Sequence, residues 1–311
     1  MTVTRRARVR ALAKINLDLR VLAKRPDGYH ELRTIFQTIS PADTIEIAFT
    51  PSRKTSIELT DDLHLPDNLV TRAARLTLEA ARKTGRVEMQ LKKRIPMGAG
   101  LGGGSSDAAA VLLALPVLAG LRLPAATLMQ LARELGSDVP FFLLGGAAVG
   151  IGRGTELFPL PDRPAQPGIL VSPAIHVSTP EAYRRLSARL TTESIENKIF
   201  SFQSEAWDGG VSSGAANDFE TVVFEQYPEI AALKQRLVRA GASRAMMTGS
   251  GSAVFGIFGA AEHATRAIRR LGEVNAVRFS LVNRASYRSL WRRALAGHTS
   301  GTKWPPQSRY A

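Results

Sequence analysis

Glycine, serine and aspartate are concentrated in one stretch of the sequence, PMGAGLGGGSSDAAA at residues 96–110, where five of fifteen positions are glycine. Glycines let successive backbone N–H groups converge on an anion with no Cβ in the way. A helix that starts directly afterwards adds its unpaired N–H groups and the positive end of its dipole. Ser105, Ser106 and Asp107 suit the first positions of such a helix, and hydroxyls can also reach phosphate or a metal ion. The stretch therefore predicts a phosphate-binding loop rather than a turn without a ligand.

The common nucleotide-binding motifs do not describe this loop. Residues 98–103 fit G-x-G-x-x-G, but a dinucleotide fold also needs an acidic residue about 20 positions later. No Asp or Glu occurs between Ala108 and Arg133. The loop lacks the Lys-Ser/Thr ending of a P-loop, and the sequence contains neither H-R-D nor D-F-G, the motifs of protein kinases. The loop therefore indicates a different class of phosphate-binding protein.

Three motifs, in the same order along the chain, resemble those of the GHMP kinases, a family of small-molecule kinases. Pro96–Ser106 is similar to the family's phosphate loop, A-K-I-N-L-D-L at 13–19 precedes it, and M-T-G-S-G-S-A-V-F at 247–255 follows it. The resemblance covers roughly residues 8–284. It implies an α+β, two-domain GHMP kinase fold, with an N-terminal ATP-binding domain of the ribosomal protein S5 domain 2-like type and a C-terminal ferredoxin-like α/β sandwich domain.

Further stretches resemble those members of the family whose small-molecule substrate carries a cytidine diphosphate head. These stretches are G-Y-H-E-L at 28–32 after R-P-D, G-S-D-V-P-F-F at 136–142 and A-N-D-F-E at 216–220. The resemblance implies transfer of a phosphoryl group from ATP, with Mg²⁺, to an alcohol of such a substrate. A GHMP kinase acting on mevalonate-route compounds or on homoserine remains the alternative within the family.

The resemblance also implies a catalytic pair. Asp138 matches the family's catalytic aspartate and Lys14 its catalytic lysine. If Lys14 lies beside Asp138, its ammonium would hold the carboxylate ionised and could steady the acceptor alkoxide. Taken without the motifs, Asp138 is equally well a residue of a turn or helix end, and Lys14 a solvated strand lysine.

Substrate-binding residues follow from the same resemblance. The acceptor side comprises the cytosine pocket, contacts near the transferred hydroxyl and the second glycine turn: Asn16, Asp18, Tyr29, His30, Thr179, Tyr183, Thr248, Gly249, Ser250 and Gly251. The ATP side comprises the phosphate loop and residues lining the adenine and ribose: Pro96, Met97, Gly98, Ala99, Gly100, Leu101, Gly102, Gly103, Gly104, Ser105, Ser106, Asn68, Leu69 and Lys92.

Metal ligands are poorly marked in the sequence. Mg²⁺ is expected because it bridges nucleotide phosphates, but there is no clear acidic pair to hold it, so no metal ligand is assigned beyond a hydroxyl such as that of Ser105. The remaining histidines show no ligand spacing, and we interpret them as structural or surface residues: His64, His176, His263 and His298.

The elements that must position these residues follow from hydrophobic periodicity. Alternating or continuous apolar residues predict strands at 7–22 with a bend at 14–16, at 33–49, at 87–91, and, with a glycine turn, at 141–152. Helical spacing predicts helices at 68–83, 105–115, 125–135, 180–190, 217–226 and 228–240. Pro116 should end or kink the second of these helices. Two strands joined by a glycine turn are predicted at 245–258.

Four prolines within residues 159–168 mark the best domain boundary. This predicts an ATP-binding domain at 1–158, a substrate domain at 159–284 and a basic tail at 285–311. In the tail, Tyr287, Leu290, Trp291, Ala294 and Leu295 share one helical face. After Gly297 the chain is polar, and we expect it to be disordered.

Composition excludes several classes of protein. The 311 residues are 44% hydrophobic and 22% charged, as in globular proteins, and include no cysteine, so a disulfide framework and a thiolate metal site are excluded. The longest uncharged runs have seventeen residues, short of the about 20 apolar residues that a membrane-spanning helix needs, and polar residues near the N-terminus interrupt any signal segment. We therefore expect a cytoplasmic protein, monomeric or homodimeric, with no membrane span.

A net charge of +14 suits a polyanionic partner. Six of the positive charges lie after residue 283 with no acidic residue among them, so the remainder of the chain carries 14 − 6 = +8. A basic RNA-binding protein is accordingly the alternative outside the enzymes. Its base-stacking surface would need grouped aromatic residues, and only 6% of the chain is aromatic. We expect no obligatory nucleic-acid partner.

Overall fold

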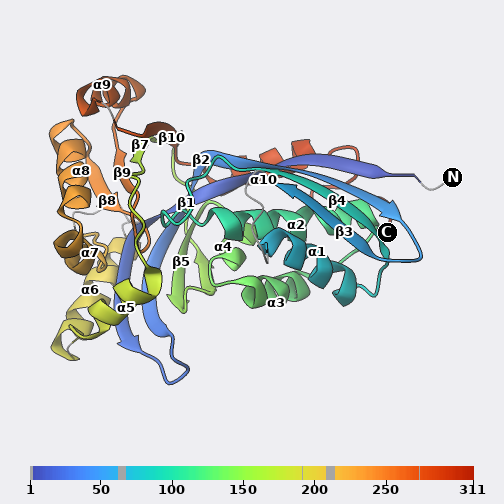
Figure 1. Cartoon of the computed structure of the whole chain (residues 1–311), viewed down its shortest axis with the longest axis horizontal. Helices are drawn as coiled ribbons and strands as arrows, with labels where there is room; N and C mark the ends of the chain where they lie inside the picture. Colours follow the sequence, from blue (N-terminus) through green and yellow to red (C-terminus); the bar gives the residue numbers. More distant parts are fainter. Residues whose placement is uncertain (1–2, 62–67, 191, 208–213, 273) are drawn as a thin grey trace.

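The structure, a computed structural model, describes residues 3–61, 68–190, 192–207, 214–272 and 274–311, which form two α+β domains (Figure 1). The strands of the N-terminal sheet are β1 (Arg5–Lys24), β2 (His30–Pro51), β3 (Ser56–Asp61), β4 (Gly85–Lys92), β5 (Ala147–Gly152) and β6 (Glu156–Pro159). Their order is β3-β4-β2-β5-β6, with β1 also paired to β2. All pairs are antiparallel except β3 with β4.

The two longest strands, β1 and β2, extend from the N-terminal sheet toward the C-terminal domain (Figure 1). The bend predicted in β1 corresponds to register shifts between Leu12 and Lys14 and between Asn16 and Asp18. Irregularities of this kind bend a strand and re-aim its side chains. Residues 11–22 of β1 are buried without interruption, because this part of the strand lies between the two domains.

Helices cover one face of the N-terminal sheet (Figure 1): α1 (Leu69–Ala80), α2 (Gly103–Ala119), α3 (Ala125–Leu135) and α4 (Val139–Leu144). The second predicted helix is expected to end or kink at Pro116. It does not end there, because α2 continues to Ala119. A proline removes a single N–H donor. Because every residue from 106 to 119 is buried, packing offsets the loss of one helical hydrogen bond.

The strand predicted for residues 141–152 is correct only from β5 onward, because the first part of the stretch forms α4. Pro140 lies in the first turn of α4, where its missing N–H costs nothing and its fixed φ suits a helix. Gly145 and Gly146 then end the helix with φ values of 68° and 74°, which residues other than glycine rarely adopt.

The C-terminal domain has a four-stranded antiparallel sheet of β7 (Pro167–Val171), β8 (Arg244–Met247), β9 (Val254–Ile257) and β10 (Ala276–Ser280). Its helices are α5 (Thr179–Ser187), α6 (Thr192–Trp207), α7 (Glu220–Gln226), α8 (Pro228–Arg239) and α9 (Ala261–Leu271). The strand order β10-β7-β9-β8 and the β-α-β-β-α-β succession match the expected ferredoxin-like arrangement. Periodicity does not predict α6.

Buried residues form one core in each domain and a third cluster where the two sheets meet. The third cluster combines residues of β1 and β2 with residues of the C-terminal sheet: Ala13, Ile15, Leu17, Ile35, Ile39, Leu170, Met246, Phe255 and Phe279. The domains are therefore joined by apolar packing as well as by the chain. The boundary at residue 159 stays a prediction.

The tail returns to the N-terminal domain. Its helix α10 (Arg284–Ala294) buries Tyr287 and Trp291 in the N-terminal core, on the face that periodicity predicts. The disorder expected after Gly297 is not what the structure describes. Trp304 Nε1 donates to the Leu143 carbonyl at 2.9 Å, and Ser308 Oγ donates to the Val117 carbonyl at 2.7 Å. Carbonyls at helix ends lack helical donors, and the tail supplies them.

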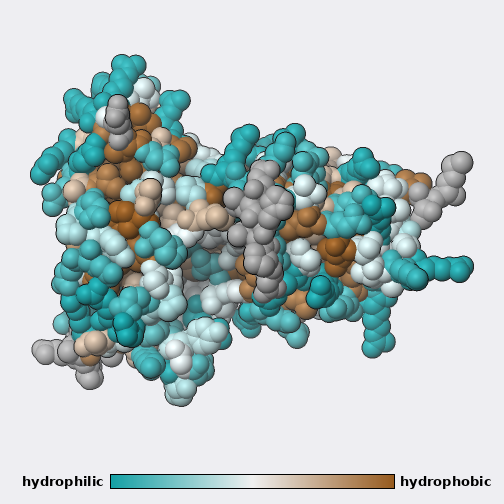
Figure 2. Space-filling model, viewed as in Figure 1, coloured by the Kyte–Doolittle hydropathy of each residue, from teal (hydrophilic) through white to brown (hydrophobic). Residues whose placement is uncertain are grey.

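Within the described parts of the chain, no helix is both long and apolar enough to cross a membrane. Hydrophilic residues are spread over both domains on the face shown in Figure 2. The cytoplasmic location and the oligomeric state stay predictions.

Replacement of Ser308 by alanine tests whether the tail is part of the N-terminal domain. Ser308 is fully buried, and its loss would leave the Val117 carbonyl with the longer hydrogen bond from Gly120 N, at 3.4 Å, at a cost of about 1–3 kcal/mol. For a chain of this size we expect the midpoint of thermal unfolding to fall by roughly 1.5–5 °C, measured by circular dichroism. The exposed Ser286 offers a matched control in Ser286→Ala. An unchanged midpoint for Ser308→Ala would contradict the docked tail.

Candidate active site

Residues of all three ordered motifs line a single cleft of about 980 Å³. β1 contributes Lys14 and Asn16, and the phosphate loop contributes Gly98, Gly100 and Gly102. The segment before α4, the helix α5 and the second glycine turn complete the walls with Ser137, Asp138, Thr179, Tyr183, Gly249 and Ser250. The cleft is thus built from both domains.

In the phosphate loop, every second residue from 98 to 102 is a glycine, because the backbone at these positions has positive φ values. Gly98, Gly100 and Gly102 have φ values of 64°, 77° and 68°, and all three line the cleft. α2 starts at the next residue, Gly103, so its first N–H groups have no helical acceptors. A curved backbone followed by a helix N-terminus is an arrangement that binds phosphate.

The second glycine turn, residues 248–251, contacts the phosphate loop through backbone atoms. Thr248 Oγ1 donates to the Gly100 carbonyl at 3.2 Å, and a Cβ on Gly100 would lie 2.1 Å from the Thr248 oxygen. Asn217 Nδ2 donates to the carbonyls of Met247 and Gly249 at 2.9 and 2.8 Å. The turn is therefore held against the loop on one side and by Asn217 on the other.

The predicted pairing of Lys14 with Asp138 is present. Lys14 Nζ lies 3.4 Å from Asp138 Oδ2, and Lys14 is 3% exposed. Asp138 immediately precedes α4, and its side chain is 32% exposed. The arrangement places an accessible carboxylate at the cleft wall beside a buried ammonium.

Asn16 connects Lys14 to the second glycine turn. Its Oδ1 accepts hydrogen bonds from Lys14 Nζ at 2.8 Å and from Gly249 N at 3.0 Å. Its Nδ2 donates to Thr34 Oγ1 at 2.7 Å. Contacts with β2 and with the C-terminal domain thereby determine the orientation of the Asn16 amide. The amide oxygen in turn holds the Lys14 ammonium.

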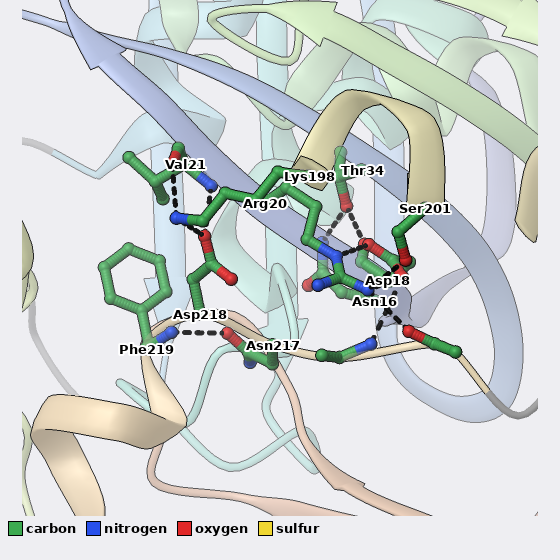
Figure 3. Close-up of polar contacts among 12 residues, drawn as sticks. Asn16, Asp18, Arg20, Val21, Thr34, Lys198, Ser201, Asn217, Asp218 and Phe219 are labelled. Atoms are coloured by element: carbon green, nitrogen blue, oxygen red, sulfur yellow. Dashed lines mark hydrogen bonds and ion pairs between the residues drawn. The ribbon is translucent and has the colours of Figure 1, made fainter. Parts of the chain in front are cut away.

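Asp18 does not reach the cleft. Figure 3 shows it turned toward Arg20 on the same strand, whose Nε lies 2.9 Å from Asp18 Oδ1. Asp18 Oδ2 accepts from the backbone N–H of Ala216 at 3.2 Å. Nearby, Asp218 Oδ2 accepts from Val21 N at 2.9 Å and from Lys198 Nζ at 2.6 Å. These contacts attach β1 to the segment 214–219, so the Asp18 carboxylate joins the domains and does not line the cleft.

The aromatic residues predicted for the cytosine pocket line the same cleft, and another side chain covers one face of Tyr183 and one face of Tyr29. The rings of His30 and Tyr183 stack with centroids 4.6 Å apart and an interplanar angle of 22°. The Arg153 guanidinium lies 3.2 Å from the centroid of the Tyr29 ring. Burial, and then the charge of Asp138, raise the pKa of Tyr183 to about 12, so the phenol stays neutral. Burial, and then the charge of Lys24, lower the pKa of His30.

The remaining residues predicted for the acceptor side surround the glycine turn. Thr179 Oγ1 and Ser250 Oγ share a hydrogen bond of 2.7 Å across the cleft wall. The Gly251 N–H donates to the Thr248 carbonyl at 3.1 Å and closes the turn. Gly251 has a φ of 94° but does not line the cleft.

The residues predicted for ATP binding are only partly brought together. Leu69 lies against the loop, because a Cβ on Gly104 would be 3.8 Å from Leu69 Cδ1. Asn68 caps α1 by accepting from Val70 N at 3.0 Å, and Ser106 Oγ donates to the Leu12 carbonyl at 2.7 Å, so both side chains have structural partners. Lys92 is exposed on the outer face of β4 and does not line the cleft.

A buried ionic cluster under the loop does not appear among the sequence predictions. Lys93 Nζ lies 2.7 Å from Asp107 Oδ2 and also contacts Asp43. A Cβ on Gly103 would be 3.3 Å from Lys93 Nζ. Burial raises the pKa of Asp107 to about 7, although the Lys93 ammonium opposes the shift. The cluster ties the start of α2 to β2.

Several cleft residues are not among the binding residues predicted from the sequence, including Lys24, Arg153, His176 and Arg184. The sequence predicts that His176 is a structural or surface residue. In the structure it lies beside the phosphate loop, because a Cβ on Gly98 would be 3.3 Å from His176 Nδ1. A single histidine among unrelated residues carries no spacing signal that could have identified it. His263 is exposed, and His298 contacts the Arg6 carbonyl at 2.9 Å; His64 lies outside the described residues.

Comparison with known families and relatives gives concordant matches. The model for the GHMP kinases N-terminal domain matches residues 68–146, and that for the GHMP kinases C-terminal region matches residues 205–276. A relative from Solibacter usitatus, named 4-diphosphocytidyl-2-C-methyl-D-erythritol kinase, is 68% identical over 100% of this chain and 99% of its own. The protein of the same name from Moorella thermoacetica is 43% identical over 85% of this chain and 94% of its own.

Solved structures agree with these matches. A crystal structure of 4-(cytidine 5'-diphospho)-2C-methyl-D-erythritol kinase superposes with a TM-score of 0.73 at 38% identity, covering 88% of this chain and 98% of that one. Homoserine kinase from Cytophaga hutchinsonii also gives a TM-score of 0.73, at 19% identity, covering 90% of this chain and 96% of its own. The second likeness concerns the fold alone.

Replacement of Gly100 by alanine tests the contact between the loop and the glycine turn. The new Cβ would clash with the Thr248 carbonyl at 2.1 Å, and the φ of 77° disfavours any side chain. Because the loop must shift, we expect the dissociation constant for ATP, measured by calorimetry, to rise at least about tenfold, which corresponds to about 1.4 kcal/mol. Gly259→Ala is the matched control, since nothing lies within 4 Å of its Cβ position. Unaltered ATP affinity in Gly100→Ala would contradict this role of the loop.

Proposed function

Because this chain belongs to the GHMP kinases and is a small-molecule kinase, we propose that it phosphorylates the 2-hydroxyl of 4-diphosphocytidyl-2-C-methyl-D-erythritol with ATP. The reaction belongs to the non-mevalonate route to isoprenoid precursors. The observation that carries the proposal is that Lys14 and Asp138 lie 3.4 Å apart in the cleft that also contains Tyr29, His30 and Tyr183. The names of the similar proteins support the choice of acceptor.

Asp138 is the proposed general base. Its partly exposed carboxylate takes the proton of the acceptor hydroxyl as that oxygen bonds to the γ-phosphorus of ATP. The bond from the γ-phosphorus to the β–γ bridging oxygen breaks, and ADP leaves. Lys14, with its ammonium directed by Asn16, offsets the negative charge that develops on the acceptor oxygen.

The ATP phosphates are proposed to lie along the glycine loop. The N–H groups between Gly98 and Gly104 and the N-terminus of α2 are the donors, and they are already ordered by the contact with residues 248–251. Preordered donors need no reorganisation when charge moves onto the phosphate oxygens. Leu69 beside Gly104 is proposed to contact the nucleoside.

Mg²⁺ is proposed to accompany the nucleotide. No cluster of three or more His, Cys, Asp or Glu side chains within the described residues could hold a metal ion. This donor set fits an ion carried mainly by phosphate oxygens and water, with the Ser105 hydroxyl as the available protein ligand at the start of α2. Bound there, the ion would neutralise charge on the β- and γ-phosphates.

The far end of the cleft has the chemistry for a pyrimidine diphosphate. Lys24, Arg153 and Arg184 line it and offer cations to the diphosphate. Tyr29 and Tyr183 offer faces on which a pyrimidine can stack. Since His30 stacks on Tyr183 and Arg153 on Tyr29, we propose that one of these two side chains swings aside when the base enters.

The acceptor is tested by assaying the purified enzyme with ATP and each of three alcohols in a coupled assay for ADP. We expect 4-diphosphocytidyl-2-C-methyl-D-erythritol to be turned over with a kcat/KM at least about 10³-fold above those for mevalonate and homoserine, because only it can use the aromatic and cationic end of the cleft. A higher kcat/KM for either of the other two would refute the proposed acceptor while leaving the family assignment intact.

The catalytic pair is tested by Asp138→Asn and Lys14→Ala. Each should lower kcat by at least about 100-fold, the usual scale for the loss of acid–base assistance, with unfolding midpoints recorded to exclude misfolding. Glu229→Gln and Lys83→Ala are matched controls at exposed sites outside the cleft. If either Asp138→Asn or Lys14→Ala turned over near the normal rate, the role assigned to that residue would be wrong.

A further inference from the structure

Two side chains of the tail donate hydrogen bonds to the last turn of α4, the helix that Asp138 precedes. Tyr287 Oη donates to the Phe142 carbonyl at 2.5 Å, and Trp304 Nε1 donates to the Leu143 carbonyl at 2.9 Å. The last carbonyls of any helix lack helical donors. In α4 they obtain donors from residues 145 and 161 positions away in the sequence.

The two donors are held in place by packing. Tyr287 is 2% exposed, and its ring lies so close to Gly145 that a Cβ there would be 2.2 Å from it. The rings of Tyr287 and Trp304 meet edge to face at 6.2 Å, and the Arg288 guanidinium lies 5.2 Å from the Trp304 centroid. Both hydrogen bonds therefore have a defined geometry.

The short length of α4 connects these donors to the cleft. The helix has six residues, about 9 Å at the usual rise, so few internal hydrogen bonds hold it. Phe142 lies against the phosphate loop, 3.0 Å from the position of a Gly102 Cβ, and Phe141 packs on Phe36 with centroids 5.0 Å apart. A displacement of the end of α4 would therefore be passed to Asp138 and to the loop.

We propose that Tyr287 and Trp304 are positioning residues for Asp138. By holding the carbonyls of Phe142 and Leu143, they fix α4 so that the Asp138 carboxylate stays beside Lys14 at the cleft wall. Neither side chain lines the cleft, so both act through α4. The inference rests on the proposed function, in which Asp138 is the base.

Tyr287→Phe and Trp304→Phe remove one donor each and keep an aromatic ring. We expect each variant to lower kcat about tenfold, since misplacement of a catalytic group by a fraction of an ångström to 1 Å costs up to about 100-fold. The KM values for ATP and for the acceptor should change less than about twofold, because the loop is also held by residues 248–251 and the residues of the acceptor side do not contact α4 in the described structure. Tyr310→Phe and Trp207→Phe are the matched controls, as Tyr310 and Trp207 are exposed and neither is bonded to α4 in the described structure.

A double-mutant cycle separates positioning from general destabilisation. In an Asp138→Asn background, Tyr287→Phe should cause no further loss of kcat, because the group that it positions has already been disabled. The same tenfold loss in that background, or an undiminished kcat in both single variants, would overturn the inference. If the Tyr287→Phe variant failed to fold, the inference would be tested with Trp304→Phe alone, in the wild-type and Asp138→Asn backgrounds.

The same cycle separates this inference from the proposed function. A normal kcat for Asp138→Asn would refute the proposed base whatever the tail variants did. A large loss in Asp138→Asn with no loss in Tyr287→Phe or Trp304→Phe would refute only the positioning role.

Discussion

Burial of the second half of β1 between the two domains is the constraint on which the rest of the molecule depends. Lys14, Asn16, Asp18 and Arg20 are all buried there, and buried polar groups need partners. Lys14 finds one at the start of α4, Asn16 in the second glycine turn, and Asp18 and Arg20 in the segment 214–219. Satisfying the polar groups of one strand thus joins three distant parts of the chain.

The cleft follows from these partnerships. Because Asn16 and Asn217 hold the second glycine turn, its backbone can approach the phosphate loop more closely than a side chain would allow. Because Lys14 is directed by Asn16, its charge lies where the carboxylate of Asp138 can meet it. The two substrates are accordingly proposed to meet where the domains meet, with the ATP side built mainly by the N-terminal domain and the acceptor side by both.

The sequence predicts best where local pattern and motif agree. The phosphate loop, the pairing of Lys14 with Asp138 and the bend in β1 belong to this group. Prediction is weaker where one residue of register decides which face a side chain occupies: Lys92 points to solvent, and its neighbour Lys93 lies under the loop. Asp18 could not be placed from sequence either, because the Ala216 N–H that donates to its carboxylate lies 198 residues further along the chain. Pro116 and the tail were misjudged because burial by distant segments overrode local preference.

The return of the tail has a consequence for the order in which the protein can mature on the ribosome. Residues 284–308 complete the core of the first domain and supply donors to α2 and α4, yet they are synthesised after the whole of the second domain. Domains generally fold as units during synthesis, the first one ahead of the next. Here the second domain emerges in full while the first still lacks its closing segment, so the nascent first domain must wait, incompletely covered, until residues 284–308 have also been synthesised.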